Sequence, residues 1–393
     1  MAIGAPGELD GAVARAVRAG PPGACLAVAT SRGMRVGCAG FRQVFGDYAP
    51  LPEPLPMTAG TWHDLASVTK VACTSLVILS LVDQGALHLA SPVCAFVPGF
   101  SGGRKGEVTV ADLLLHRAGL WEWWPAYIGA SGPDAALELV SALPLRYPPG
   151  AGRHYSDLGF MLLGRIAETV TGKPLPEAFS ALVAAPLGMR DMRFAHPPEG
   201  AEVAAGAAGD SVERRMIATG EPYPVAADTG SFSRWRTRVR LGEVDDGNAY
   251  HAFGGVAGHA GLFGTVADLC RLGLVLLGSA GSTGGADAAG MTAGDGGPWR
   301  PATVRAFLAD GPDPGQALGF RSWTTTVGSC AARASGHPGF TGTAFAVLPA
   351  HGAAVVLATN RLHVAAAPAA FGPIWRNALD AAHTALHIHA EER

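Results

Sequence analysis

The sequence predicts an α+β fold (an α/β sandwich): both ends of the chain build one antiparallel sheet, and a mainly helical part is inserted between them. Segments typical of strands occur near the N-terminus and again after residue 320, while helical apolar spacing dominates the middle of the chain. A helical segment also stands at each end. Both terminal helices can therefore flank the sheet.

The N-terminal elements are predicted as follows. Residues 9–18 have the apolar spacing of a helix. Residues 24–30 and 35–41 flank the turn at 31–33 and indicate a hairpin of two strands. The proline-rich segment 49–56 is expected to be a loop.

Helices are predicted for most of the middle of the chain. The first is long and mostly apolar, and it ends before Gly85, a plausible C-cap. The Gly- and Ala-rich segment 278–297 is expected to be a flexible surface insertion. The predicted helices cover residues 67–84, 110–115, 133–143, 157–170, 175–185 and 267–277.

The C-terminal part returns to strands. Three are predicted, at 322–327, 343–348 and 353–358, followed by an amphipathic helix at 374–388. We therefore expect a sheet domain formed by residues 1–75 and 300–393, an inserted helical domain at 76–299, and an active site at their interface.

Composition excludes several classes of protein. The net charge is −3, charged residues make up 16% of the 393 residues, and no basic block is present, which argues against a nucleic-acid partner. A hydrophobic content of 48% is too high for a disordered chain. Apolar stretches such as 76–82 are shorter than the ~20 residues of a membrane span, so no membrane partner is expected. The first ten residues lack the pattern of a secretion signal, which predicts a cytoplasmic location.

Two residue types are unusual in number or spacing. Of the 29 basic residues only three are lysines, Lys70, Lys105 and Lys173. The cysteines are scattered and form no CxxC pair, so we expect free, mostly buried thiols. They are Cys25, Cys38, Cys73, Cys94, Cys270 and Cys330.

The first candidate for chemistry is Ser67-Val68-Thr69-Lys70, at the head of the long helix. Positions i and i+3 share a helix face, so the lysine can reach the serine hydroxyl and activate it as a nucleophile. The alternative is a capping serine followed by a solvated lysine, and this pattern by itself leaves both open.

Two further motifs lie downstream. Tyr155-Ser156-Asp157 places a phenol and a carboxylate at the start of a predicted helix, although Asp157 as a plain N-cap is the simpler interpretation of that motif alone. The segment 336–343 begins Gly-His-Pro-Gly-Phe, and its glycines allow the backbone to approach a ligand closely. A Gly-rich turn into a strand is the alternative there.

In this order, Ser-x-x-Lys, Tyr-Ser-Asp and His-x-Gly resemble the motifs of the serine β-lactamase and penicillin-binding-protein superfamily. The chain is most similar to the class C β-lactamase-like branch, which contains esterases, DD-peptidases and transacylases. Similar stretches span about residues 15–365. They include residues 64–70, 112–120, 155–172, 186–189 and 242–268.

The resemblance implies a class C β-lactamase-like fold and a role for each motif. Ser67 would attack an ester or amide carbonyl and form an acyl-enzyme, with Lys70 as its base or electrostatic partner. Tyr155 would carry a proton to the leaving group. The backbone N–H groups of Ser67 and Phe340 would form the oxyanion hole. Other matching residues are expected to be structural, namely Asp64, Asp112, His116, Arg117 and His259.

Two positions depart from the usual motifs and are expected to support the site together with Gly339. Asp157 replaces the usual Asn, and a carboxylate near Lys70 favours the charged ammonium, which makes the lysine a weaker base. His337 replaces the Lys that pairs with a substrate carboxylate in β-lactamases and DD-peptidases, and it is mostly neutral near pH 7. This exchange favours neutral esters, amides or thioesters.

Aromatic and histidine residues elsewhere give weaker signals. Trp121, Trp123 and Trp124 either form an apolar wall for a substrate or pack a loop, and the two readings are about even. His383 and His387 are spaced i, i+4 on the last helix without a visible third ligand, which favours a solvated helix over a metal pair. We predict no metal and no cofactor.

Three functions follow, in order of preference. The first is a serine esterase or acyltransferase that forms an acyl-enzyme on Ser67 from a small-molecule acyl donor, a small ester, thioester or amide. It would pass the acyl group to water, an alcohol or an amine, in the manner of enzymes that tailor natural products. The second is a D-amino-acid peptidase or weak β-lactamase of the same family. The third is a catalytically silent binding module.

Overall fold

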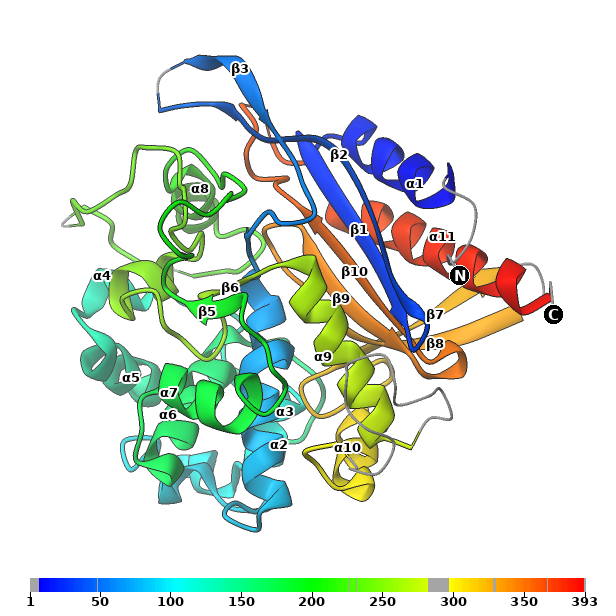
Figure 1. Cartoon of the computed structure of the whole chain (residues 1–393). Coiled ribbons are helices and arrows are strands. Elements are labelled where there is room, and N and C mark those ends of the chain that lie inside the picture. Colours follow the sequence, from blue (N-terminus) through cyan, green and yellow to red (C-terminus); the bar gives the residue numbers. More distant parts are fainter. Residues whose placement is uncertain are drawn as a thin grey trace.

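The structure is a computed structural model (Figure 1). It describes residues 7–47, 49–225, 227–230, 232–281, 297–327, 330–365 and 367–391, and their side chains up to residue 386 except that of Val327. Residues 282–296 of the predicted insertion 278–297 lie outside the described residues.

Both ends of the chain contribute to one seven-stranded sheet, as predicted. The strand order is β3-β2-β1-β10-β9-β8-β7, and every neighbouring pair is antiparallel. The strands are β1 (Gly23–Thr30), β2 (Gly33–Phe45), β3 (Pro50–Pro56), β7 (Arg321–Val327), β8 (Cys330–Pro338), β9 (Thr343–Leu348) and β10 (Ala353–Thr359).

Two strands differ from the sequence prediction. The segment expected to be a proline-rich loop is β3, which pairs only with β2. Prolines are tolerated there because an edge strand leaves some N–H positions unpaired. The prediction also missed β8, whose Ala-rich sequence lacks the branched and aromatic residues typical of strands.

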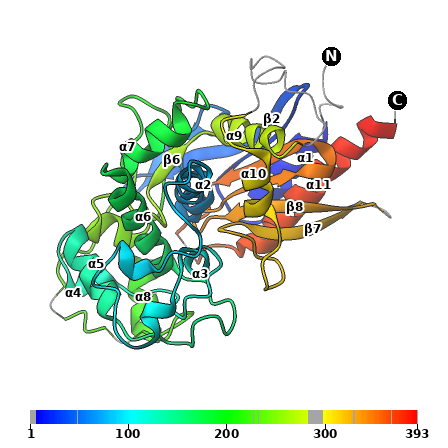
Figure 2. The same cartoon turned by 90° about the horizontal axis from the view of Figure 1, so that it is seen from below.

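Alternate residues of the central strands point to two separate cores. In β1, Leu26 and Val28 face the core under the terminal helices, whereas Ala27 faces the larger core. The terminal helices α1 (Gly7–Arg18) and α11 (Phe371–Glu391) lie together on one face of the sheet (Figures 1 and 2).

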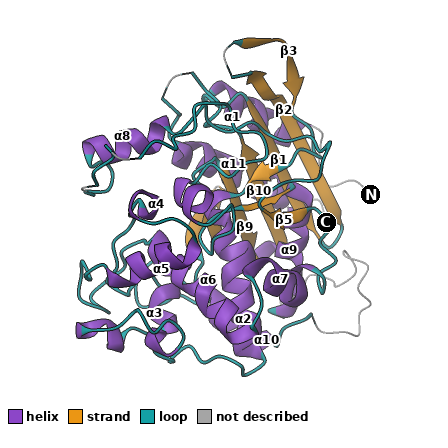
Figure 3. Cartoon of the chain, turned by 90° about the vertical axis from the view of Figure 1, so that its left-hand side faces the viewer, coloured by secondary structure: helices purple, strands orange, loops and turns teal. Residues whose placement is uncertain are grey.

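The opposite face is covered by helices from the middle of the chain (Figures 2 and 3). Within the predicted inserted range, α9 (Val266–Ser279) packs directly against β1, β9 and β10. The remaining helices are α2 (Ser75–Asp83), α3 (Val110–Leu114), α4 (Ala126–Gly129), α5 (Pro133–Ala142), α6 (Asp157–Thr171), α7 (Leu175–Phe179), α8 (Ser211–Thr219) and α10 (Pro301–Leu308). A small second sheet, absent from the prediction, has the order β4 (His63–Asp64), β6 (Leu262–Gly264), β5 (Met192–Phe194).

The long apolar helix begins irregularly. A 3₁₀ turn (Ala66–Val68) and a π turn (Lys70–Thr74) precede the regular helix α2. By length and composition, the stretch Ala66–Asp83 is long and apolar enough to cross a membrane. The sequence prediction considered only shorter apolar runs and did not identify it. Its residues are 83% buried inside the fold, as in the core helix of a globular protein.

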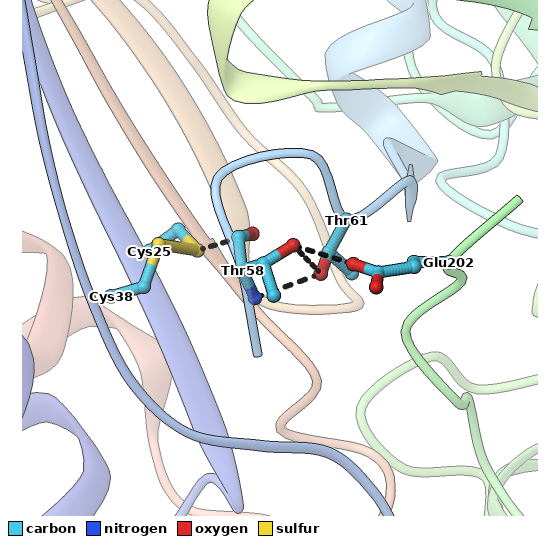
Figure 4. Close-up of a disulfide and its surroundings, with 5 residues drawn as sticks. All are labelled: Cys25, Cys38, Thr58, Thr61 and Glu202. Carbon is cyan, nitrogen blue, oxygen red and sulfur yellow. Dashed lines mark hydrogen bonds between the residues drawn. A yellow bond between two sulfur atoms is a disulfide. The ribbon is translucent and has the colours of Figure 1, made fainter. Parts of the chain in front are cut away.

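The expectation that all cysteines are free is wrong for one pair. Cys25 and Cys38 lie directly opposite in the β1–β2 register, with Cα atoms 4.2 Å apart, and they form a disulfide. Figure 4 shows the pair beside the turn that contains Thr58 and Thr61. Sequence spacing alone cannot identify such a pair, because it depends on the hairpin register.

The expectation of a solvated last helix is wrong at His383. This side chain is fully buried, and its ring lies 4.7 Å from the ring of His351, centroid to centroid. The face of α11 that packs on the sheet therefore includes this histidine.

The buried His63 predicts a pH-dependent stability. Burial lowers the pKa of this histidine to about 4, so the native state resists protonation while the unfolded chain takes up a proton near pH 6.5. Stability should therefore fall as the pH drops from about 6.5 to about 4. Relative to His63→Leu, the wild-type free energy of unfolding should fall by about 1.4 kcal/mol per pH unit in that window. Urea unfolding at several pH values measures this difference, and parallel curves would contradict it.

Candidate active site

The candidate nucleophile Ser67 stands at a strained turn between β4 and the long helix. The preceding residue, Ala66, has a φ of 44°, in the left-handed region that L-residues rarely adopt. Its N–H donates to the Asp64 carboxylate at 2.8 Å, which holds this conformation. The Asp64 carbonyl in turn accepts a hydrogen bond from the Thr341 hydroxyl at 2.8 Å, so the nucleophile turn is joined to the end of the sheet.

Lys70 is fully buried and its ammonium meets three oxygen atoms. Nζ lies 2.8 Å from Ser67 Oγ, 3.1 Å from the His259 carbonyl and 2.7 Å from Asp157 Oδ1. An ammonium has three protons to donate and no lone pair, so these three acceptors match its charged form. The neighbouring carboxylate offsets the cost of burying the charge.

The backbone carbonyl of His259 belongs to the site, although the sequence analysis predicted only a structural role for this residue. Two hydrogen bonds fasten its loop along the helix: Leu262 N donates to Thr69 Oγ1 at 3.2 Å, and Thr74 Oγ1 donates to the Gly258 carbonyl at 2.6 Å. The resemblance at 242–268 identified this segment, but only the fold shows that a backbone oxygen there faces Lys70.

Behind this loop, the side chain of His259 is fixed by a carboxylate. Its Nε2 lies 2.9 Å from Asp246 Oδ1. Burial alone would raise the pKa of Asp246, but the charge and hydrogen bond of His259 lower it to about 2. The carboxylate is therefore ionised and orients the histidine whose carbonyl contacts Lys70.

Tyr155 completes the contacts around the serine hydroxyl. Its Oη lies 2.9 Å from Ser67 Oγ, and its ring packs against the ring of His116 at 4.7 Å. The same histidine accepts a hydrogen bond from Ser156 N, so it positions the motif. Burial, reinforced by the Asp157 carboxylate, raises the pKa of Tyr155 well above its usual value, and the phenol is protonated near neutral pH.

His337 lies beside the tyrosine, with ring centroids 5.8 Å apart. Its Nδ1 is 2.7 Å from the Pro338 carbonyl, which can only accept, so this nitrogen carries the proton and Nε2 is an acceptor. Burial, reinforced by the Lys70 charge, lowers the pKa of His337 well below its usual value. The histidine is neutral and supplies no fixed positive charge.

Gly339, just after β8, lies in close contact with the residues that precede Ser67. A Cβ at this position would lie 2.7 Å from the Leu65 carbonyl oxygen and 3.4 Å from Ala66 Cβ. The next residue, Phe340, is fixed through its carbonyl, which accepts from Arg361 Nε at 2.8 Å. Only glycine allows this stretch of backbone to lie against the residues that precede Ser67.

The three tryptophans are divided by the fold. Trp123 is buried in a small separate core with Ile217 and Val225 and offers no surface to a substrate. Trp121 and Trp124 are half-buried and pack edge to face at 5.3 Å. For Trp123, the packed-loop alternative is correct.

Metal ligation has no support in the described part of the chain, where no group of three His, Cys, Asp or Glu residues could hold an ion. The chemistry available here is that of an activated hydroxyl. A serine, a buried ammonium and a neutral phenol meet within hydrogen-bond distance.

Comparison with known proteins agrees with this arrangement. Residues 9–374 match the Beta-lactamase family. The chain belongs to this family. As a family member it is a serine hydrolase of the β-lactamase and penicillin-binding-protein type.

Named relatives cover most of the chain. It is 31% identical to the N-acetylmuramyl-L-alanine amidase of Bacillus subtilis (91% of this chain, 81% of the relative). It is 30% identical to a putative D-alanyl-D-alanine carboxypeptidase of Escherichia coli (80% and 72%). The fold is similar to that of a class C beta lactamase from Rhodobacter sphaeroides, with a TM-score of 0.62 and 17% identity over 98% and 99% of the two chains. The predicted superfamily and fold class are confirmed.

The close approach at Gly339 predicts that Gly339→Ala slows acylation. The added methyl group pushes the β8 end away from the Leu65 carbonyl and displaces the Phe340 N–H, the expected oxyanion donor. Loss of one such donor typically lowers the rate by about a hundredfold. Stopped-flow acylation measures the loss. Gly372→Ala is the matched control, because a Cβ there meets nothing within 4 Å. A wild-type rate in Gly339→Ala would contradict the prediction.

Proposed function

We propose that the protein forms an acyl-enzyme on Ser67 from a small ester, thioester or amide and passes the acyl group to water, an alcohol or an amine. The observation that carries the proposal is the double contact at Ser67 Oγ, with Lys70 Nζ at 2.8 Å and Tyr155 Oη at 2.9 Å. A hydroxyl held between a cation and a proton carrier is suited to nucleophilic attack.

In this proposal Lys70 acts as an electrostatic partner and Tyr155 moves the proton. The serine oxygen forms a bond to the carbonyl carbon while its proton passes to Tyr155 Oη. Tyr155 passes its own phenolic proton to the leaving atom, whose bond to the carbonyl carbon breaks. The phenol begins and ends protonated, and the buried ammonium stabilises the negative charge that develops on the serine oxygen. Deacylation repeats the steps with the acceptor in place of the leaving group.

The oxyanion hole in this proposal consists of the N–H groups of Ser67 and Phe340. The left-handed Ala66 presents the first at the head of the helix, where free N–H groups and the helix dipole favour an anion. The tight approach of Gly339 brings the second close to the nucleophile turn.

A peptidase or amidase acting on D-amino acids is the second candidate. Its support is the naming of one relative as a putative D-alanyl-D-alanine carboxypeptidase. Turnover of D-alanyl amides well above that of aryl esters would favour it, whereas the reverse order favours the esterase or transacylase.

Intact-mass trapping tests the proposed function. Wild-type protein mixed with activated esters should gain the mass of one acyl group, and Ser67→Ala should gain none and lose at least about a thousandfold in turnover. Ser101→Ala, an exposed serine, is the matched control and should label normally. A subsequent chase with water, alcohols and amines identifies the acceptor. Absence of any acyl adduct on Ser67 would contradict the proposal and favour a silent binding module.

A further inference from the structure

The segment 245–248 is connected to both ends of the Ser-x-x-Lys motif. Asp245 N donates to Asp64 Oδ2 at 2.7 Å, and the same carboxylate holds the nucleophile turn through its other oxygen. Asp246 Oδ1 lies 2.9 Å from Nε2 of His259, whose carbonyl contacts the buried ammonium. A displacement of this segment would therefore move the nucleophile turn and one of the three oxygen atoms around the ammonium.

Glu213 holds this segment from the first turn of α8, where the helix dipole favours a negative charge. Its Oε1 accepts from Gly247 N at 2.6 Å, and its Oε2 accepts from Tyr127 Oη at 2.7 Å. Glu213 is half-buried as a whole, but both of its partners are buried, so its carboxylate points inward. Tyr127 belongs to α4. One carboxylate therefore joins α8, α4 and the segment 245–248 by charge-assisted hydrogen bonds.

The contact between Glu213 and Gly247 leaves no room for a side chain. A Cβ at Gly247 would overlap Glu213 Oε2 and lie 2.7 Å from its Cδ. The φ of Gly247 is −70°, which any residue can adopt. The approach of the carboxylate, and not the backbone conformation, is therefore what requires glycine here.

Glu213 lies outside the motifs described above, and its two hydrogen-bond partners are not reacting groups. We propose that Glu213 is a positioning residue of the acyl-enzyme site, which keeps the segment 245–248 where the nucleophile turn and the Lys70 ammonium require it. This role rests on the proposed acyl-enzyme function. It can be large, because a misplacement of about 1 Å in an active site can cost about a hundredfold in rate.

Single-turnover acylation of Ser67 by an activated aryl ester tests this role. The reaction gives the limiting acylation rate and the ester concentration at half-saturation as separate quantities. Burial, reinforced by the charges of Asp246 and Asp210, raises the pKa of Glu213 to about 7. The reaction is therefore followed at about pH 8.5, where the carboxylate is ionised.

Glu213→Ala should lower the limiting rate by about tenfold or more and leave the half-saturating concentration near its wild-type value, because it displaces reacting groups without removing a group that binds substrate. Glu213→Gln should stay within about twofold of the wild type. Its carbonyl can accept from Gly247 N and its amide can donate to Tyr127 Oη. Glu138→Ala, which removes an exposed glutamate of α5, is the matched control and should acylate at the wild-type rate.

Gly247→Ala breaks the same contact from the other side and should cause a similar loss. The double variant Glu213→Ala, Gly247→Ala should be no slower than the slower single variant, because both substitutions remove one shared contact. Two substitutions that loosened separate parts of the fold would instead have effects that multiply.

A wild-type rate in Gly247→Ala or Glu213→Ala would overturn the role, and so would effects that multiply in the double variant. A Glu213→Gln variant as slow as Glu213→Ala would also overturn it, because charge rather than position would then set the rate. If Glu213→Ala does not fold, Gly247→Ala and Glu213→Gln decide the question. Failure of the wild type to acylate Ser67 would overturn the acyl-enzyme function itself.

Discussion

The buried ammonium of Lys70 is held by three oxygen atoms that come from three distant parts of the chain: the Ser67 hydroxyl, the His259 carbonyl and the Asp157 carboxylate. A lysine removed from water without such partners would lose its proton or destabilise the fold by several kcal/mol. Every other part of the site is arranged around this charge. It fixes the serine oxygen, and the carboxylate that pairs with it also helps to keep the Tyr155 phenol protonated.

The fold brings the catalytic groups together because the turn after β8 packs against the start of the long buried helix that carries Ser67 and Lys70. The left-handed residue Ala66 turns the chain between them, and Asp64 holds that turn through its side chain and through its carbonyl. On the sheet side, Gly339 leaves room for the contact. The same geometry places the neutral His337 beside the tyrosine, so this histidine supplies no fixed positive charge to the site.

Much of this arrangement could be predicted from the sequence, because it depends on local patterns. The strand-like segments near both ends of the chain predicted most strands of the large sheet. The i, i+3 spacing predicted the contact between Ser67 and Lys70. The disulfide Cys25–Cys38 and the His259 carbonyl could not be predicted, since both depend on which segments lie opposite each other in three dimensions. The strands β3 and β8 were not predicted, because β3 is rich in proline and β8 has few branched or aromatic residues.

The scarcity of lysine makes the central claim directly measurable. With only three lysines in the chain, ¹⁵N labelling of the side-chain amines gives a simple NMR spectrum in which Lys70 is assigned by its loss in Lys70→Met. The account predicts that near neutral pH the Lys70 signal is that of a charged ammonium, and that Asp157→Asn, which removes the carboxylate at 2.7 Å, shifts it toward the neutral amine. A neutral amine in the wild-type protein near neutral pH would contradict the account and make Lys70 the general base.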